Sequence, residues 1–192
     1  MNATGRLYEF VYRGILADEA LDKAGRRSGS SDLSAQEVAD ALSVDLLDPD
    51  ALAAAARMAA VYAAIAAFEI SARRFITKVL LESHGDDWWD KGVSDKIRTF
   101  ALSRRDEEEK TRWHGRRGTE LLDYVEMGHL VNIIQQNWSA FEDYIPRMDW
   151  ATAIFGGIER SRNVIMHSGF LDIEDIERVG MHIRDWAKQV GS

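Results

Sequence analysis

The sequence contains no cysteine. A chain without cysteine cannot form disulfides, bind a metal through thiolates or use a cysteine nucleophile. This absence also agrees with a reducing compartment, so we expect the protein to be cytoplasmic. Alternating runs of β-branched residues between turn dipeptides are lacking as well, whereas apolar residues recur at spacings of three and four. We therefore predict an all-α fold.

The sequence also lacks a net positive charge. It has 24 Lys and Arg against 32 Asp and Glu, which gives a formal charge of −8. Such a surface does not attract nucleic acid over long distances, so any contact with nucleic acid has to be local. With 46% hydrophobic and 29% charged residues, the composition is that of a globular domain.

Signals for export or membrane insertion are absent from the sequence. Residues 1–14 carry Glu9 and lack the basic start, apolar run and cleavage site of a secretory signal. The long apolar run at residues 51–68 consists mostly of alanine, contains Arg57 and leads directly into Glu69. We predict that this run is a buried helix and that the protein has no membrane span.

The spacing of apolar residues divides the chain into helices. An amphipathic helix is expected around residues 7–16, with a polar linker at residues 25–31. Ser34 and Glu37 have the pattern of a capping box, which predicts a short helix. Asp48 and Pro49 predict the start of the longest helix, which should run to about residue 83.

Further helices are predicted in the second half of the chain. A turn is expected at residues 84–90, and the helices are expected from residue 93 toward a basic stretch at 104–118, then over 121–141, 150–166 and 174–190. Four longer helices with short connections predict a bundle at residues 49–192, preceded by an N-terminal helical extension at residues 1–48. The tryptophans expected in the core or an interface are Trp88, Trp89, Trp138 and Trp186.

Residues 162–167, Arg-Asn-Val-Ile-Met-His, combine a fixed cation with a titratable ring. RNA carries its own nucleophile, the 2′-hydroxyl, which a base can deprotonate. His167 can serve as base or acid near neutral pH, and Arg162 can offer phosphate oxygens a bidentate positive charge. These two residue types therefore suffice for RNA cleavage. The alternative is that Arg162 forms a surface ion pair and His167 is an ordinary histidine at a helix C-terminus.

The order of arginine, polar residue and histidine, late in an α-helical bundle, resembles the signature of the HEPN superfamily. The likeness covers about residues 50–190 and extends to a bacterial branch related to the HEPN domain of a nuclear RNA-surveillance endonuclease. The other residues that carry it are Phe68, Glu69, Arg73, Trp88, Trp89, Asn137, Trp138, Glu159, Arg184, Asp185 and Trp186.

The resemblance implies a metal-independent endoribonuclease that needs no cofactor and acts as a homodimer with one composite site. Arg162, Asn163 and His167 would be its catalytic residues. It also implies a toxin or phage-defence role, with a regulatory protein or antitoxin as a further kind of partner. The alternative is a non-catalytic module that binds RNA or mediates dimerisation.

Helix geometry constrains how the motif can act. Positions 162 and 167 are roughly 140° apart on an ideal α-helix, so both side chains cannot face one groove. Either the helix ends near His167, which Ser168 and Gly169 would allow, or a second subunit completes the site. We therefore predict a homodimer.

Three other groups of residues are candidates. A basic loop with a stacking aromatic would bind RNA, although a solvated loop with cancelling charges explains it equally well; its residues are Arg112, Trp113, His114, Arg116 and Arg117. Glu69 and Arg73, at i and i+4, would orient Arg162 or His167, or form a plain surface pair. Glu126 and His129 match half of a di-iron motif, and because no second copy exists we predict no metal.

Overall fold

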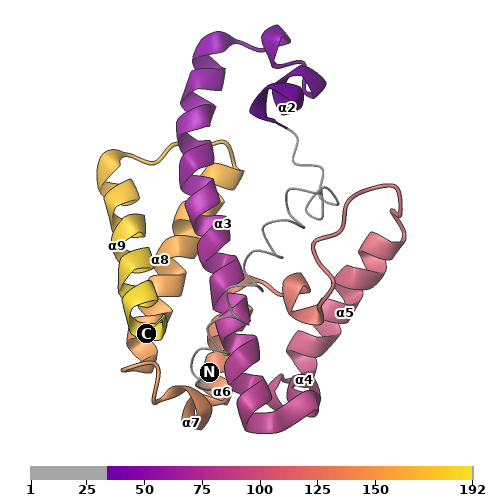
Figure 1. Cartoon of the computed structure of the whole chain (residues 1–192), viewed down its shortest axis with the longest axis vertical. Helices are drawn as coiled ribbons and strands as arrows, with labels where there is room; N and C mark the ends of the chain where they lie inside the picture. Colours follow the sequence, from indigo (N-terminus) through magenta and orange to yellow (C-terminus); the bar gives the residue numbers. More distant parts are fainter. Residues whose placement is uncertain (1–33, 192) are drawn as a thin grey trace, which may run out of the picture. The chain divides into compact units, whose positions relative to one another are not determined.

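The computed structural model of the chain describes residues 34–191. The chain divides into two compact units, Met1–Leu52 and Ala53–Ser192, and each is treated by itself. The helix predicted around residues 7–16 and the linker at 25–31 lie outside the described residues. Between residues 34 and 191 every regular element is a helix, which confirms the all-α prediction (Figure 1).

The described part of the first unit begins with the predicted capping box. Ser34 Oγ accepts a hydrogen bond from Glu37 N at 3.2 Å, and the Glu37 carboxylate accepts one from Ser34 N at 2.8 Å. These bonds satisfy backbone N–H groups that have no partner within the helix. They open the short helix α2, Ala35–Ala41, which a single 3₁₀ turn, η1 (Val44–Leu46), follows.

Helix α3, Pro49–His84, is the longest helix of the described chain and confirms the predicted start and end within a residue. Asp48 Oδ1 accepts a hydrogen bond from Ala51 N at 2.8 Å, as expected of an N-cap. The prediction of a buried helix needs correction, because burial is confined to one stripe and most residues before Ile65 are exposed. The stripe consists of Met58, Val61, Ile65, Phe68, Ala72, Ile76, Val79 and Leu80.

By length and composition alone, the segment Pro49–Gly92 could cross a membrane. Its most apolar window has a mean hydropathy of 1.7, and 22% of that window is buried. Core helices of soluble proteins can have the same length and composition, so this measure does not by itself place the helix in a membrane.

The connection after α3 differs from the predicted turn. Gly85 has a φ of 67°, which reverses the chain directly after the helix. A 3₁₀ turn, η2 (Gly85–Asp87), and the short helix α4 (Trp88–Gly92) follow, so Trp88 and Trp89 begin a helix instead of lying in a turn. Helix α5, Asp95–Glu109, then confirms the predicted helix.

The continuous helix predicted for residues 121–141 is wrong, because the chain forms three short elements there. These are η3 (Leu121–Tyr124), α6 (Met127–Gln136) and α7 (Trp138–Phe141). The second break is at Asn137, whose side chain donates to Gly92 O at 2.7 Å and to Ile133 O at 2.8 Å. His84 Nε2 lies 3.1 Å from Asn137 Oδ1, so this amide joins the ends of α3, α4 and α6. Asn137 therefore has a structural role.

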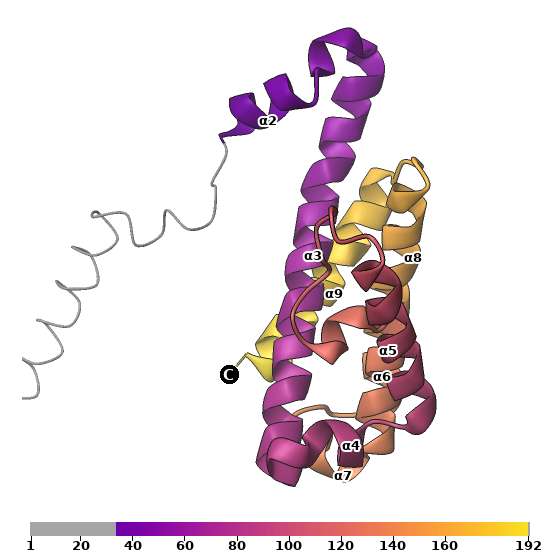
Figure 2. The ribbon, with the colours of Figure 1, turned by 90° about the vertical axis from the view of Figure 1, so that its right-hand side faces the viewer.

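Helices α8 (Met148–Met166) and α9 (Ile173–Val190) confirm the last two predicted helices within two residues. Their packing centres on Trp186, which is 2% exposed and stacks on Trp150 with ring centroids 6.0 Å apart. Phe68 of α3 and Phe155 of α8 contact the same indole edge-on, so α8 and α9 pack beside α3 (Figure 2). Trp186 is a core aromatic, as predicted, and Trp88, Trp89 and Trp138 pack partly buried against the core.

Candidate functional site

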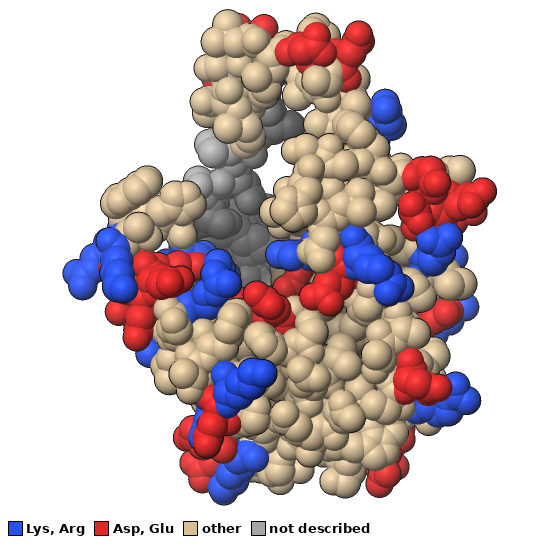
Figure 3. Space-filling view, turned by 180° about the vertical axis from the view of Figure 1, so that it is seen from behind, with Lys and Arg blue, Asp and Glu red and all other residues tan. Residues whose placement is uncertain are grey.

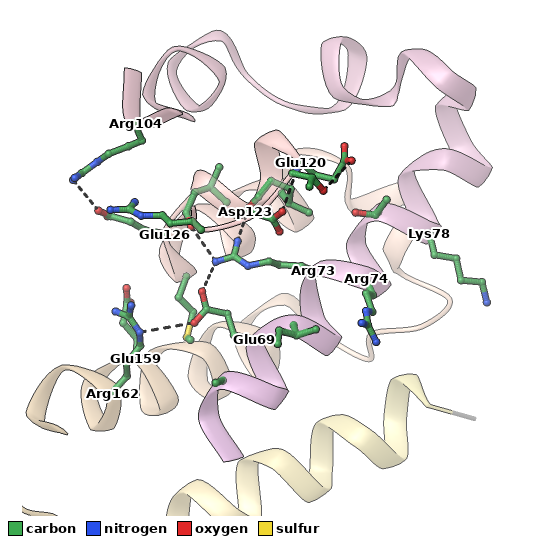
Figure 4. Close-up of a pocket in the computed structure, with 18 of the residues that line it drawn as sticks. Glu69, Arg73, Arg74, Lys78, Arg104, Glu120, Asp123, Glu126, Glu159 and Arg162 are labelled. Carbon is green, nitrogen blue, oxygen red and sulfur yellow. Dashed lines mark hydrogen bonds and ion pairs between the residues drawn. The ribbon is translucent and has the colours of Figure 1, made fainter. Parts of the chain in front are cut away.

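An open groove of about 1230 Å³ lies in the second unit, between α3, the segment around η3 and α8 (Figure 4). Its charged lining is balanced. The cations are Arg73, Arg74, Lys78, Arg104, Arg117 and Arg162, and the acids are Glu69, Glu82, Glu120, Asp123, Glu126 and Glu159. Charges of both signs are also interspersed over the face of the molecule seen in Figure 3. The groove is therefore not a generic attractor of polyanions, and recognition has to come from individual groups.

Arg73 and Glu69 form the most buried ion pair of the groove. Their side chains are only 13% and 19% exposed, and Arg73 donates from Nη2 to Glu69 Oε1. The same guanidinium donates to Leu122 O at 2.5 Å and to Val125 O at 3.1 Å. Arg73 is thus held by a carboxylate on its own helix and by two backbone carbonyls at η3. A plain surface pair is excluded.

Arg162 reaches the groove from α8. Its Nε lies 3.8 Å from Glu69 Oε2, and its side chain is 38% exposed. Because Glu69 Oε1 is taken by Arg73, the carboxylate bridges the two arginines (Figure 4). The structure therefore brings Glu69, Arg73 and Arg162 together. This is one of the two arrangements expected from the sequence, in which Glu69 and Arg73 orient either Arg162 or His167. Asn163 and His167 are not brought to this cluster, because both are exposed and lie outside the groove lining.

His167 is the residue at which α8 ends. The last helical residue is Met166, and the N–H of His167 still donates to the carbonyl of Asn163 at 3.2 Å. Of the two alternatives that helix geometry allows, a helix end near His167 is therefore the one that the structure shows. The imidazole is exposed, in contrast to the partly buried Arg162 on the preceding turns.

The turn after His167 has the geometry of a Schellman motif. Gly169 N donates to Val164 O at 2.8 Å and Ser168 N donates to Ile165 O at 3.0 Å, while Ser168 adopts a φ of 59°. A Cβ at Gly169 would lie 2.7 Å from Val164 Cγ1 and 2.8 Å from Val164 O, so only glycine fits without a shift. This turn fixes where the His167 backbone leaves the helix.

Large apolar side chains are exposed on both sides of His167. Val164 and Met166 precede it, with exposures of 40% and 54%, and Phe170 and Ile173 follow it, with exposures of 61% and 66%. We call these four residues the apolar rim. These residues are neighbours in sequence, and Val164 and Met166 point to different sides of α8 because they lie two residues apart. Exposed apolar side chains that gather on one surface are typical of a site that binds another protein.

The loop between α5 and η3 contains the five predicted RNA-binding residues, and all five are exposed. Trp113 is 85% exposed, and its ring contacts that of His114 at a centroid distance of 5.7 Å. Arg117 lines the groove and pairs with Glu108 at 2.9 Å, and Arg112 Nε donates to Glu109 O at 3.3 Å. The Arg116 side chain forms no hydrogen bond or ion pair with residues 34–191. The loop thus keeps an indole surface free for stacking.

Several groove residues were not predicted as site residues from the sequence. Glu159 precedes Arg162 by one helical turn and could have been found from that spacing, whereas nothing in the sequence links Arg74, Lys78, Arg104 or Glu126 to this groove. Glu126 and His129 close a local cap, in which Glu126 N donates to His129 Nδ1 at 3.2 Å. No cluster of three or more metal-ligating side chains occurs within the described residues.

The helical bundle with an Arg-Asn-x-x-x-His segment at the end of its penultimate helix defines the class of protein. The model of the family described as Swt1-like HEPN matches residues 64–191, about two thirds of the chain. The chain therefore belongs to the Swt1-like HEPN family. Neither the curated proteins nor the solved structures contain a match to it.

Proposed function

We propose that this protein is an endoribonuclease that cleaves RNA without a metal ion, by attack of the 2′-hydroxyl on the adjacent phosphate. HEPN domains are often ribonucleases. The observation that carries the proposal is the division of the 162–167 segment: a guanidinium is held at a groove, and an imidazole is exposed where the helix ends.

The chemistry needs one proton acceptor, one proton donor and a cation. A neutral His167 takes the proton of the 2′-hydroxyl, whose oxygen then bonds to phosphorus. The bond from phosphorus to the 5′-oxygen breaks, and a protonated imidazole gives that oxygen a proton. The products are a 2′,3′-cyclic phosphate and a 5′-hydroxyl. Arg162 stabilises the charge on the phosphorane, and Asn163 orients the imidazole or the phosphate.

The proposed enzyme is a homodimer, because two imidazoles in different protonation states supply both proton transfers. The apolar rim supports a second copy as the partner, since it flanks His167 on both sides. Association through this surface would bring two copies of the segment toward one another across a two-fold axis. It would also cover side chains that are costly to leave in water.

The loop carrying Trp113 would bind the RNA strand beyond the cleaved bond. An indole that is 85% exposed offers a surface on which any base can stack, and neighbouring guanidinium groups can pair with phosphates. This local contact is what a chain with a net charge of −8 requires. A toxin or phage-defence role, controlled by a regulatory protein or antitoxin, stays a prediction from the family.

The test compares the purified protein with its His167→Ala variant on labelled total RNA in excess chelator. We expect cleavage by the parent alone, with 2′,3′-cyclic phosphate and 5′-hydroxyl ends. Equal cleavage by the variant would refute the role of His167. RNA that is bound but intact with both proteins would support the non-catalytic module instead. Thermal melting of the two proteins should agree, because His167 is exposed.

A further inference from the structure

Glu69 contacts two arginines that differ in their surroundings. Through Oε1 it binds Arg73, whose terminal nitrogens also donate to the backbone carbonyls of Leu122 and Val125. Through Oε2 it faces Nε of Arg162 at 3.8 Å. Both terminal nitrogens of Arg73 thus donate within the protein, whereas the terminal nitrogens of Arg162 form no hydrogen bond or ion pair with residues 34–191.

The charges of these three side chains do not cancel, although the lining of the groove as a whole is balanced. Arg73 contributes +1, Glu69 −1 and Arg162 +1, so a net charge of +1 remains. An isolated pair of Glu69 and Arg162 would be neutral and would offer a phosphate much less attraction. Because Arg73 is only 13% exposed, solvent screens its interaction with Glu69 less than it would at an open surface.

The direction of the contact also matters. A guanidinium can bind two oxygens through Nε and one terminal nitrogen, or through its two terminal nitrogens. Glu69 lies on the Nε side of Arg162, which leaves the terminal pair for a ligand. Because Arg162 lines the groove, an RNA phosphate in the groove could reach these two terminal nitrogens.

We propose that Glu69 and Arg73 form a neutral positioning pair that holds Arg162 by its Nε side and preserves its positive charge for the substrate phosphate. The inference rests on the proposed function for its substrate, but the arrangement itself can be tested without cleavage. Glu69 and Arg73 are positioning residues, since they act through Arg162.

The first readout is the Nε–Hε signal of Arg162 in ¹⁵N spectra of the whole protein, assigned by its loss in Arg162→Lys. We expect Glu69→Gln to shift this signal and to speed exchange of its proton with water at least several-fold. The control is Asp175→Asn, which removes a similar ion pair with Arg178 on α9, outside the groove. An unchanged Arg162 signal in Glu69→Gln would overturn the proposal, whether or not the protein cleaves RNA.

The second readout separates charge from position. Arg73→Gln leaves Glu69 to neutralise Arg162, so the affinity for a cleavage-resistant 2′-O-methyl RNA should fall about tenfold at low salt. Glu69→Gln keeps the cationic charge, so its affinity should not fall. Cleavage by Glu69→Gln should nevertheless decrease about 10- to 100-fold in kcat, because a small misplacement of a catalytic group has such effects.

The double variant Glu69→Gln, Arg73→Gln restores the net charge of +1 and should regain most of the affinity lost in Arg73→Gln. A purely structural role predicts the opposite, namely that the double variant binds worse than either single one. Equal affinity of Arg73→Gln and the parent, with normal melting, would also overturn the proposal. If the parent fails to cleave RNA, the proposed function fails while the spectra and the affinities still decide this inference.

Discussion

The two ends of the 162–167 segment are built differently. Arg162 is held at a groove by Glu69, which is itself fixed by Arg73 and through it by the backbone at η3. His167 is exposed at the end of α8, and among the described residues its hydrogen bonds to the chain are those of its backbone. A single chain therefore holds the arginine in place but leaves the imidazole exposed.

This difference indicates which parts of the proposed site a single chain can supply. A charged group held before substrate arrives needs no reorganisation during the reaction, which is the usual source of electrostatic catalysis. An exposed imidazole has no such preparation and would gain it from a covering surface. The apolar rim around His167 is a surface suited to that partner.

The largest effect on RNA cleavage should come from replacing Arg162, the end of the segment that the chain holds in place. Arg162→Lys keeps the charge but removes the planar fork, so kcat/KM for RNA should fall by about 10²- to 10³-fold. Arg160→Lys, on the same helix and outside the groove lining, is the matched control and should retain activity. Cleavage assays under single-turnover conditions measure both. Full activity of Arg162→Lys would show that a point charge suffices.

The next largest effect should come from changing the apolar rim around the exposed His167. Phe170→Glu would place a charge in the apolar rim, where Phe170 is 61% exposed, and should weaken dimerisation by about 30-fold or more, equivalent to roughly 2 kcal/mol. Sedimentation velocity over a range of concentrations measures this, and activity should fall in parallel. Met181→Glu, at an exposed apolar residue of α9 outside the rim, is the control. A Phe170→Glu protein that still dimerises normally would place the interface elsewhere.

A smaller effect is expected at the loop. Trp113→Ala should lower affinity for single-stranded RNA by about tenfold, since stacking of one base contributes about 1–3 kcal/mol. The melting temperature should not change, because the side chain is 85% exposed. Trp113→Phe should retain most of the affinity. Fluorescence anisotropy with a labelled oligonucleotide distinguishes the three proteins, and equal affinity of all three would remove the loop from the binding surface.

The smallest effect concerns His182, which packs between α9 and Gly157 of α8. Burial against α8 lowers the pKa of His182, whereas Asp185 acts in the opposite direction and Arg178 and Arg160 add to the lowering. A lowered pKa means that the unfolded chain binds the proton more readily. Stability from this group is therefore complete above about pH 6.5, the ordinary value, and is lost as the pH falls below it.

Replacing His182 should show how much of the pH dependence of stability comes from the packing of α9 on α8 and not from the candidate site. We expect the urea midpoint of the parent to fall more between pH 7.5 and pH 5.0 than that of His182→Gln. Identical pH dependence in the two proteins would contradict this account.

The parts of the fold that could be predicted are those set by neighbouring residues. The caps at Ser34 and Asp48 depend on bonds within three residues, and their helices begin where the patterns predict. The break at Asn137 could not be predicted, because it depends on a bond to Gly92, 45 residues away. The helical spacing of apolar residues continues on both sides of Asn137, so the sequence pattern does not reveal that the helix is interrupted there.

The same contrast applies to the candidate site. The spacing of Glu69 and Arg73 predicts that they pair, but the bridge to Arg162 joins residues on two helices far apart in sequence. The end of α8 follows from Ser168 and Gly169, whose local backbone bonds close the turn. Arg104 and Glu126 enter the groove through packing between separate elements, so no local pattern places them there.

The most direct test of the central claim uses two RNA oligonucleotides that differ at one position. Both contain a mapped cleavage site, and one carries a 2′-deoxynucleotide immediately 5′ of the cleaved phosphate. In excess chelator, we predict that the all-RNA oligonucleotide is cut there and that the deoxy version binds equally well but stays intact at that bond. Cleavage at the deoxy position would contradict attack by the 2′-hydroxyl, and with it the roles given to Arg162 and His167.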